Sequence, residues 1–326
     1  MINQKKDILP KVSITIAVKE YNSYLDECVR NCLQLEYPNF EILVLPDNSC
    51  GLPYAEIKII PTGPVGPSHK RDIALEHSEG DILAYLDDDT FPRKDWLKNA
   101  VKHFEKDEVA AVGGPAVTPS QDSFMQKASG YVYSSFVGGG SLNYRYVPGK
   151  SREVDDYPTC NLLVRKAVME ELEGFDTNFW PGEDTKLCLQ ITKDLGKKII
   201  YDPGALVYHH RRKLFLPHLK QVWSYALHRG YFVKKFPETS MRLTYFIPTF
   251  FVFGLVVGSL LSFLSPALRP LFLVVLAGYF LTLFLDSFRS KSLIMTLAVT
   301  WGTFLTHVTY GVGFVKGLFA GRLREE

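Results

Sequence analysis

The sequence predicts an α/β domain followed by an α-helical transmembrane region. Short apolar, β-branched runs alternate with helical segments through about the first ninety residues. Several of these runs end in acidic residues, and the composition changes sharply near residue 245, after which charged residues become scarce. Alternating strands and helices are typical of a largely parallel sheet with right-handed crossovers.

The expected elements follow one another in a regular order. The run KVSITIA is typical of a buried parallel strand, and residues 23–35 have apolar side chains at helical spacing. The further strands are FEILVL, AEIKII and DILAYLD, and the helix SHKRDIALEHS ends at Gly80. Ligands of such sheets bind beyond the carboxyl ends of the strands, so the residues that follow each strand are candidates for a functional site.

The strand DILAYLD runs into three consecutive aspartates, Asp87, Asp88 and Asp89. Along an extended chain Asp87 and Asp89 alternate with Asp88, so these two face the same side. Adjacent like charges repel one another, and carboxylate oxygens are the ligands that hard divalent cations prefer. An isolated acidic run is also typical of a solvated turn before a helix, so the metal interpretation depends on the residues around it.

Composition and charge limit the class of protein. The chain has 326 residues, enough for one large domain or two smaller ones, and its formal net charge is +2. This balance offers no polybasic field for nucleic-acid binding. The cysteines are scattered and odd in number, which is typical of a reduced, cytosolic protein. They are Cys28, Cys32, Cys50, Cys160 and Cys188. The N-terminal sequence MINQKKDILPKVS lacks an apolar stretch, so no signal peptide is expected.

Three apolar segments follow the change in composition. Residues 245–264 carry no charge, and as a helix they would span roughly 30 Å, the thickness of the hydrocarbon core of a bilayer. The other two segments cover residues 271–285 and 293–315, and the third is the more polar because it contains five threonines and a histidine. We therefore expect a membrane region with two to three apolar helices over residues 244–326, the third segment either crossing, re-entrant or interfacial.

Flanking cations predict the orientation. Lys234, Lys235 and Arg242 precede the first apolar segment, and Arg289 and Lys291 lie between the second and third, so both sets belong on the cytoplasmic side. The expected location is the inner (plasma) membrane, multi-pass, with the catalytic domain in the cytoplasm.

Three regions are therefore expected along the chain. Residues 1–210 form the cytosolic catalytic domain, residues 211–243 form amphipathic interfacial helices, and the membrane region follows from residue 244. Within the first region, residues 123–150 are too aromatic for a plain linker and too rich in glycine for a core element. They are expected to be a mobile segment on the acceptor side, near the membrane.

Five ordered blocks resemble glycosyltransferase family 2, the inverting nucleotide-sugar transferases of the GT-A fold, a Rossmann-like nucleotide-diphospho-sugar transferase architecture. The blocks are VSITIAVKEYNSYLDECVRNCL, YPNFEILVLPDNS, KRDIALEHSEGDILAYLDDDTFPRKDWL, TCNLLVRKAVMEELEGFD and PGEDTKLCLQI, and the resemblance covers about residues 10–235. Two positions depart from the family pattern: Pro46 and Asp47 stand for its two acids, and Gln190 stands where an arginine is often found. The QxxRW signature of processive synthases is missing, which argues for transfer of a single sugar.

The resemblance implies metal-dependent transfer. By it, Asp87 and Asp89 match the DxD motif: Asp87 faces the ribose of the donor or the metal, and Asp89 ligates the Mg²⁺ or Mn²⁺ that bridges the donor phosphates. Asp88, between them, is expected in the nucleotide site. His209 resembles the third metal ligand of some family members, although His210 is the neighbouring candidate. A surface histidine in a basic loop is the alternative interpretation.

The resemblance also implies a catalytic base and a nucleotide site. Asp184 is expected to be the base and Glu183 an acceptor contact or alternate base, although acids that open a helix are also common as capping residues. Lys70 or Arg71 is expected to contact the diphosphate, or else to belong to an exposed cationic helix face. The residues expected around the nucleotide base are Asp47, at its imide edge, and Ala17, Lys19 and Glu20.

These features predict a membrane-anchored hexosyltransferase of family 2 in the formation of cell-envelope polysaccharide. It would move one sugar from a UDP-, GDP- or dTDP-linked donor to a lipid-linked or membrane-associated acceptor. Two alternatives stay open. A polyprenyl-phosphate sugar synthase would use the basic cluster of Arg211, Arg212 and Lys213 at the membrane entrance, and a non-catalytic membrane scaffold would retain only the fold.

Overall fold

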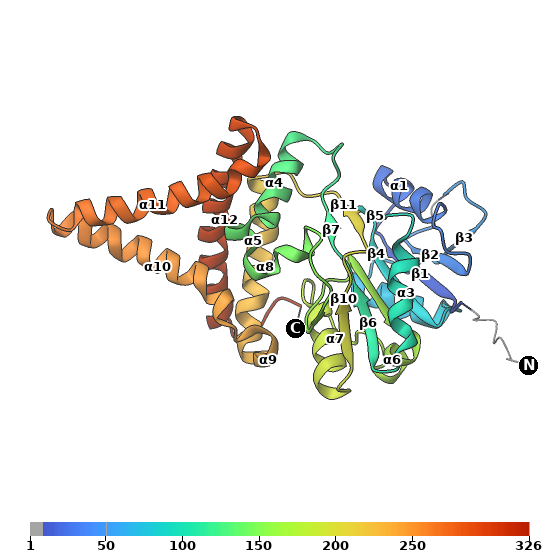
Figure 1. Cartoon of the computed structure of the whole chain (residues 1–326). Helices are drawn as coiled ribbons and strands as arrows, with labels where there is room; N and C mark the ends of the chain where they lie inside the picture. The colour runs from blue at the N-terminus through green and yellow to red at the C-terminus, as the bar shows by residue number, and fades with distance from the viewer. Residues whose placement is uncertain (1–8, 50, 326) are drawn as a thin grey trace, which may run out of the picture. The chain divides into compact units, whose positions relative to one another are not determined.

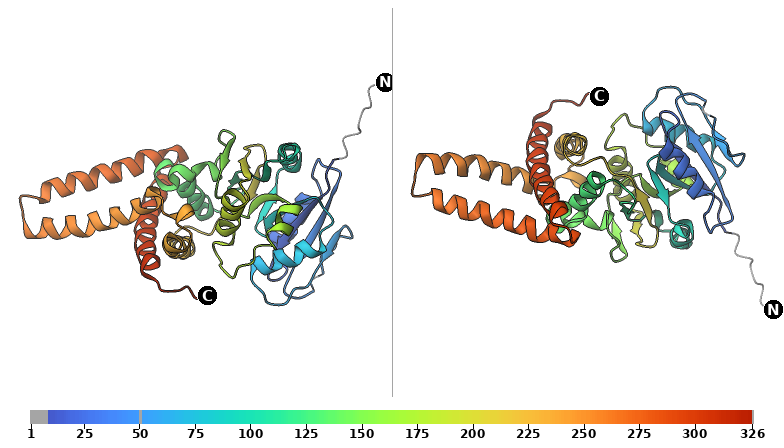
Figure 2. Two further views of the ribbon diagram at one scale, coloured as in Figure 1. Left: turned by 90° about the horizontal axis from the view of Figure 1, so that it is seen from below. Right: turned by 90° about the horizontal axis from the view of Figure 1, so that it is seen from above.

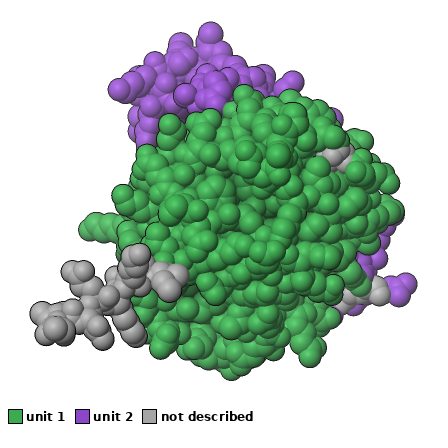
Figure 3. All heavy atoms as spheres, turned by 90° about the vertical axis from the view of Figure 1, so that its right-hand side faces the viewer, with its two compact units in different colours: residues 1–116, 148–208 green, residues 117–147, 209–326 purple. Residues whose placement is uncertain are grey.

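The computed structural model describes residues 9–49 and 51–325 (Figure 1). Cys50 and most of the N-terminal stretch that bears on a signal peptide lie outside these residues. The chain divides into two compact units, one of residues 1–116 and 148–208, the other of residues 117–147 and 209–326 (Figure 3). Residues 117–147, which the sequence places inside the catalytic domain, thus belong to the same unit as the C-terminal helices.

The first unit is built on a mixed sheet with the strand order β3-β2-β1-β4-β9-β6-β10-β8. The strands β3, β2, β1 and β4 are parallel, as expected, whereas β9 runs antiparallel to both of its neighbours. The bounds are Val12–Ala17 (β1), Phe40–Leu45 (β2), Ile57–Ile59 (β3), Ile82–Asp87 (β4), Val109–Gly113 (β6), Arg152–Val154 (β8), Asn161–Arg165 (β9) and Lys198–Tyr201 (β10).

Helices of the first unit pack on this sheet, and the larger of its buried apolar clusters contains residues of several strands and of α1. Ile14, Ile16 and Leu86 of the strands are fully buried together with Cys28 and Cys32, so these two cysteines pack in the core. Burying each large aliphatic side chain contributes about 1.5–3 kcal/mol. The helices are Ser23–Cys32 (α1), Pro67–His77 (α2), Trp96–Val101 (α3), Lys102–Glu105 (η1), Lys166–Glu171 (α6), Glu183–Leu189 (α7) and Gln190–Asp194 (η3).

A small second sheet has the strand order β5-β11-β7, and its strand β5 follows β4 directly in the chain. Its strands are Thr90–Pro92 (β5), Ala116–Val117 (β7) and Val207–His209 (β11). Only Asp88 and Asp89 separate β4 from β5, and Thr90 Oγ1 donates to the carbonyl of Asp87 (2.8 Å) to close this turn. Because β11 pairs with β5, the end of β11 is brought next to the aspartate run.

The second unit is helical. The helix α12 packs against α4, α8, α10 and α11, and α10 and α11 run side by side in Figures 1 and 2. The bounds are Phe124–Ser134 (α4), Phe136–Gly139 (α5), Gly140–Arg145 (η2), Leu216–Lys235 (α8), Pro237–Ser240 (α9), Leu243–Leu264 (α10), Arg269–Ser287 (α11), Phe288–Ser290 (η4) and Leu293–Phe319 (α12).

Residues 124–134 form the helix α4, and four of its eleven residues are buried, so the expectation that this segment contains no core element is wrong for α4. A capping box formed by Ser123 and Gln126 starts this helix. Ala128 and Val132 are fully buried and pack against Val299 of α12. The small residues that argue against a core element therefore permit a close approach between two helices.

Residues 211–243 contain one long helix, α8, and the short α9. The exposed aromatic of α8 is Tyr225, whereas Tyr231 and Phe232 are buried. The helix therefore turns an apolar face to α12 instead of leaving that face open to a lipid headgroup region.

Within the described residues, two helices are long and apolar enough to cross a membrane: Leu243–Leu264 and Arg269–Ser290. Almost none of either helix is buried inside the protein. The third apolar segment forms α12, whose threonines at positions 296, 300, 303 and 306 are buried on one face. Its polarity follows from packing against protein, because Thr306 Oγ1 donates to the carbonyl of Gly302 (2.7 Å) and lies 2.9 Å from His218 Nε2.

Candidate active site

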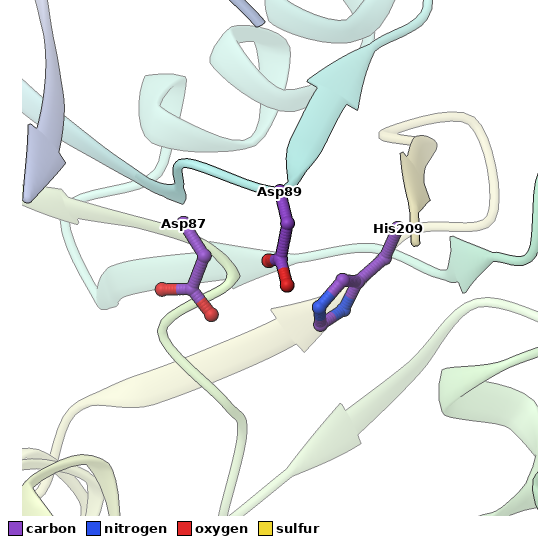
Figure 4. A group of neighbouring side chains, drawn as sticks. All are labelled: Asp87, Asp89 and His209. Carbon is purple, nitrogen blue, oxygen red and sulfur yellow. The ribbon is translucent and has the colours of Figure 1, made fainter. Parts of the chain in front are cut away.

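Asp87, Asp89 and His209 come together at the carboxyl end of β4 (Figure 4). Each residue offers one ligand atom, and these atoms all lie within 4.8 Å of one another. All three side chains are half-buried. His209 is the last residue of β11, whose other two residues belong to the first unit. Two carboxylates and an imidazole can ligate a divalent cation, and the imidazole favours Mn²⁺ over Mg²⁺, which prefers oxygen ligands.

The two neighbouring histidines differ in their surroundings. Arg211 Nη1 lies 3.1 Å from His209 Nδ1 and orients that ring. His210 is buried, and its Nδ1 pairs with Asp122 Oδ1 in the second unit. Of the two candidates for a metal ligand, it is therefore His209 that joins the aspartates.

Asp88 points to a different partner from its two neighbours. Asn22 Nδ2 donates to Asp88 Oδ2 (2.6 Å), and Asn22 Oδ1 also accepts from the first backbone N–H groups of α1. Burial and the charge of Asp89 raise the pKa of Asp88 to about 6, against the opposing effect of the Asn22 bond. Asp88 thus joins the end of β4 to the start of α1. Asn22 was not predicted, although asparagine before an apolar periodic run is a helix-start signal.

Arg71 joins the two acidic motifs. Its side chain is buried, with Nη2 3.0 Å from Asp87 Oδ1 and Nη1 2.9 Å from Glu183 Oε1. Burial alone would lower the pKa of Arg71, but the charges of Glu183 and Asp87 outweigh burial and raise it. The guanidinium therefore stays charged and fixes the start of α7 relative to the end of β4.

The two acids that open α7 have different environments. Glu183 is buried, and besides Arg71 it accepts from the backbone N–H of Gly182 (3.0 Å). Asp184 is half-buried, and its Oδ1 accepts from the N–H of Thr185 (2.8 Å) at the positive end of the helix. Asp184 is therefore the more accessible carboxylate of the pair.

Lys70 is buried like Arg71. The alternative interpretation of these two residues, an exposed cationic face of α2, is therefore wrong. The Nζ atom of Lys70 donates to Asp47 Oδ1 (2.6 Å) and to the carbonyls of Val18 (2.9 Å) and Leu45 (3.2 Å). It therefore ties together the ends of β1 and β2. Ala17, Lys19 and Glu20 lie at the same edge of the sheet, the first half-buried and the other two exposed.

Comparison with known proteins identifies the kind of domain that carries these residues. Residues 13–172 match the family described as Glycosyl transferase family 2. A pre-mycofactocin glycosyltransferase of Mycobacterium tuberculosis is 30% identical over 151 residues, which are 46% of this chain and 31% of the relative. A glucosyl-dolichyl phosphate glucuronosyltransferase of Haloferax volcanii is 26% identical over 157 residues, 46% of this chain and 48% of the relative. The chain thus spans a third to a half of the length of these relatives.

A solved structure matches almost the whole chain. It is the mannosyltransferase PcManGT from Pyrobaculum calidifontis in complex with GDP-Man and Mn²⁺, with a TM-score of 0.64 and 18% sequence identity, covering 96% of this chain and 88% of that one. At this identity the likeness shows the fold alone, and it confirms the predicted GT-A architecture. Residues 13–172 therefore form a glycosyltransferase family 2 domain, in a chain with the GT-A fold.

Proposed function

We propose that this glycosyltransferase is membrane-anchored and metal-dependent, and that it transfers a single sugar, with inversion, from a nucleotide-linked donor to a lipid-linked acceptor. The observation that carries the proposal is the bridge through Arg71. This single buried cation pairs with Asp87 of the metal-binding group and with Glu183, which opens the same helix as Asp184. The two acidic motifs that sugar transfer requires are therefore held in one rigid arrangement.

Each acid has a separate role in this proposal. Asp87, Asp89 and His209 would hold the divalent cation, which when bound neutralises the charge of the departing diphosphate. Asp184 accepts the proton of the acceptor hydroxyl as its oxygen attacks the anomeric carbon. The bond from that carbon to the diphosphate oxygen breaks on the opposite face, and the pair of electrons leaves with the diphosphate. No enzyme nucleophile is needed, because inversion takes one displacement.

The nucleotide would lie at the ends of β1 and β2. Asp47 is proposed to accept from the imide edge of the base, and Lys70 holds this carboxylate in place through its 2.6 Å contact. Ala17, Lys19, Glu20 and Asp88 are proposed as the remaining walls of the nucleotide site. The Pyrobaculum calidifontis neighbour, which was solved with GDP-Man and Mn²⁺, supports a nucleotide sugar and a divalent cation as ligands.

Two observations support a lipid-linked acceptor and a membrane location. The helices α10 and α11 are long and apolar enough to cross a membrane, and almost none of either is buried. The names of two relatives refer to lipids: the Haloferax volcanii protein above, and a beta-monoglucosyldiacylglycerol synthase of Trichormus variabilis, 29% identical over 137 residues. We expect Lys234, Lys235 and Arg242 to hold the catalytic domain on the cytoplasmic side of the inner membrane.

The two alternatives gain less support. The basic cluster expected of a polyprenyl-phosphate sugar synthase is reduced, because Arg211 is buried and stacks 4.9 Å over the ring of Tyr146, which leaves Arg212 and Lys213 exposed. A scaffold has no need of an acid cluster whose mutual repulsion costs stability.

Transfer into lipid tests the proposal. The full chain, in detergent or reconstituted in bilayers, would be incubated with radiolabelled UDP-, GDP- and dTDP-sugars, Mn²⁺ and a bacterial total lipid extract. We expect label from one donor class to enter the organic phase, and to stay in water when a chelator is added. A folded protein that turns over no donor under any of these conditions would leave the scaffold as the better account.

A further inference from the structure

A small pocket of the first unit lies outside the residues assigned above. Its volume is about 280 Å³, and it is lined by Val65, Gly66, Ser68, His69, Asn178 and Trp180. This is just below the range of about 300–1,000 Å³ that drug-sized ligands occupy. The pocket is therefore of the right order for one small ring.

Trp180 is the largest of the residues that line this pocket. Its side chain is 61% exposed, the highest value among the large apolar side chains in the described part of the first unit. Its neighbour Phe179 is buried. The side chain of Phe179 thus packs inside the protein, whereas that of Trp180 is exposed to solvent. An exposed indole at a pocket offers a large, rigid apolar face at a low cost in side-chain entropy.

The loop that carries Trp180 is fixed to α2 at several points. Ser68 Oγ donates to the carbonyl of Thr177 (2.7 Å), and the N–H of Phe175 donates to Asp72 Oδ1 (2.7 Å). The Arg71–Glu183 ion pair holds the far end of the same loop. Hydrogen bonds before Trp180 and an ion pair after it thus hold this segment in place. A side chain that binds a ligand needs such support.

The same contacts place the pocket next to the proposed catalytic base. Trp180 precedes Asp184 by four residues. Ser68 at the pocket and Arg71, which bonds Asp87, are three residues apart on α2, or about 4.5 Å along the helix axis. Asp47 and the other residues proposed for the nucleotide do not line the pocket, which favours the acceptor over the donor.

The polar groups around the indole suit a hydroxylated ring. His69 and Asn178 are exposed and can each donate and accept a hydrogen bond. The helix α2 begins without a side-chain cap, and Gly66, Ser68 and His69 at its start line the pocket. A pyranose has one apolar face and hydroxyl groups around its edge. The indole of Trp180 can stack on that face, and the neighbouring polar groups can bond the hydroxyls.

We propose that this pocket is the acceptor subsite, where a pyranose ring of the acceptor stacks on Trp180 and is hydrogen-bonded by His69 and Asn178. The inference rests on the proposed function and narrows it: the acceptor is a glycolipid that already carries a sugar. A lipid phosphate without a sugar would have no ring to stack on Trp180.

The test compares the full-length protein with its Trp180→Phe and Trp180→Ala variants. The probes are the methyl glycosides of glucose, galactose, mannose, N-acetylglucosamine and glucuronic acid, and binding is measured by saturation-transfer difference NMR. We expect at least one glycoside to bind the wild type. Its affinity should fall roughly tenfold in Trp180→Ala and much less in Trp180→Phe, which keeps an aromatic face. Asn178→Ala should weaken the same glycoside by a smaller factor.

A second measurement on the same samples separates this inference from the proposed function. Hydrolysis of the donor without acceptor, and the affinity for its nucleoside diphosphate, should be the same in wild type and Trp180→Ala. Donor turnover by a wild type that binds none of the glycosides would overturn the subsite and leave the transferase intact. Equal glycoside binding by wild type and Trp180→Ala, or a parallel loss of donor affinity, would also overturn it. A wild type with no donor turnover contradicts the proposed function itself.

Discussion

Lys70 and Arg71 are adjacent in the sequence, yet each holds a different part of the site. Lys70 is bonded to Asp47 and the ends of two strands, while Arg71 is bonded to Asp87 and Glu183. Both are buried, so removing one partner leaves a charge without compensation in a low-dielectric region. These residues therefore have structural importance beyond any contact with the diphosphate.

Lys70 provides a test of this dual importance. Lys70→Met should lower the free energy of unfolding by about 3 kcal/mol, because the half-buried carboxylate of Asp47 is left without its cation. Adding Asp47→Leu should recover much of the stability, since the charge is removed, but it should not recover affinity for nucleoside diphosphate if Asp47 contacts the base. Thermal unfolding and calorimetric titration report the two effects. A double variant that binds nucleotide like the wild type would show that Asp47 has no part in recognition.

Asp184 is the residue on which proton transfer depends. Asp184→Asn keeps the size of the side chain and removes its basicity, so turnover should fall by a factor of about 10² or more. Donor affinity should change little, because the base faces the acceptor. Asp176→Asn is the matched control: Asp176 is exposed, precedes the same helix and bonds Lys186 on the surface. If donor affinity fell together with turnover in Asp184→Asn, Asp184 would belong to the nucleotide site.

At the scale of elements, the helix α8 contains a buried histidine that links two neighbours. His218 lies 2.8 Å from Ser129 Oγ of α4 through Nδ1 and 2.9 Å from Thr306 Oγ1 of α12 through Nε2. Burial, and to a smaller extent the charge of Arg211, lower its pKa to about 4. The folded protein thus keeps this ring neutral at pH values where an unfolded chain protonates it.

The stability of the helical unit should therefore fall in acid. Above about pH 6.5 His218 is neutral in both states; between there and about pH 4 the unfolded state alone binds the proton, so stability declines as the pH falls. The loss is on the order of 3 kcal/mol for the full interval. Tm measured from pH 7.5 to 4.5 should decline less steeply for His218→Gln than for wild type. His77 is exposed, so the Tm of His77→Gln should change with pH as that of the wild type does. Parallel curves for wild type, His218→Gln and His77→Gln would show that His218 does not cause the acid loss of stability.

The contact between α8 and α12 depends on glycine. A Cβ atom added at Gly230 would lie 2.1 Å from the carbonyl oxygen of Phe314, a backbone atom that cannot move alone. Gly230→Ala should therefore destabilise the protein by about 1–3 kcal/mol or more through overpacking. Gly254→Ala in α10, where the added atom would meet nothing within 4 Å, should leave Tm unchanged or slightly raised. Equal Tm values for the two variants would mean that the helices adjust to a larger residue.

The strands β1, β2 and β4 could be predicted from sequence, because their apolar runs are largely buried on both faces and read as continuous apolar segments. The helix α4 could not, since its small residues acquire meaning only where α12 approaches them. The aspartates and His209 were identifiable as candidates, but the choice between His209 and His210 depends on which ring the pairing of β11 turns toward the site. The buried partners of Lys70 and Arg71 are separated from them in sequence, and a local pattern cannot show such contacts.

For the whole molecule, the proposed transfer to a lipid-linked acceptor requires α10 and α11 to reside in a membrane. Deleting the chain after Met241 would be a poor test, because it would also remove α12 and expose the buried faces of α4 and α8. A sharper change replaces Phe253 of α10 and Val274 of α11, which are 67% and 68% exposed, with lysine. A lysine at the centre of a spanning helix, as at Phe253, costs roughly 2.5–3.5 kcal/mol, and one nearer the end, as at Val274, costs less. The double variant should therefore shift toward the alkali-extractable fraction of membranes.

Leucine at the same two positions is the control and should keep the protein in the membrane pellet. Identical fractionation of the lysine and leucine variants would show that these helices are not in contact with lipid, and the lipid-linked acceptor would lose its main support.

The most direct test of the central claim is the release of nucleoside diphosphate by Asp89→Ala. The full-length wild type, Asp89→Ala and the exposed control Asp107→Ala would be assayed with the donor that the wild type accepts, in Mn²⁺ and in chelator. We expect wild type and Asp107→Ala to need the metal. Asp89→Ala should lose nearly all turnover and the metal-dependent part of nucleotide affinity while keeping its Tm. Full turnover by Asp89→Ala in chelator would contradict the assignment of the aspartate run as a metal-binding catalytic site.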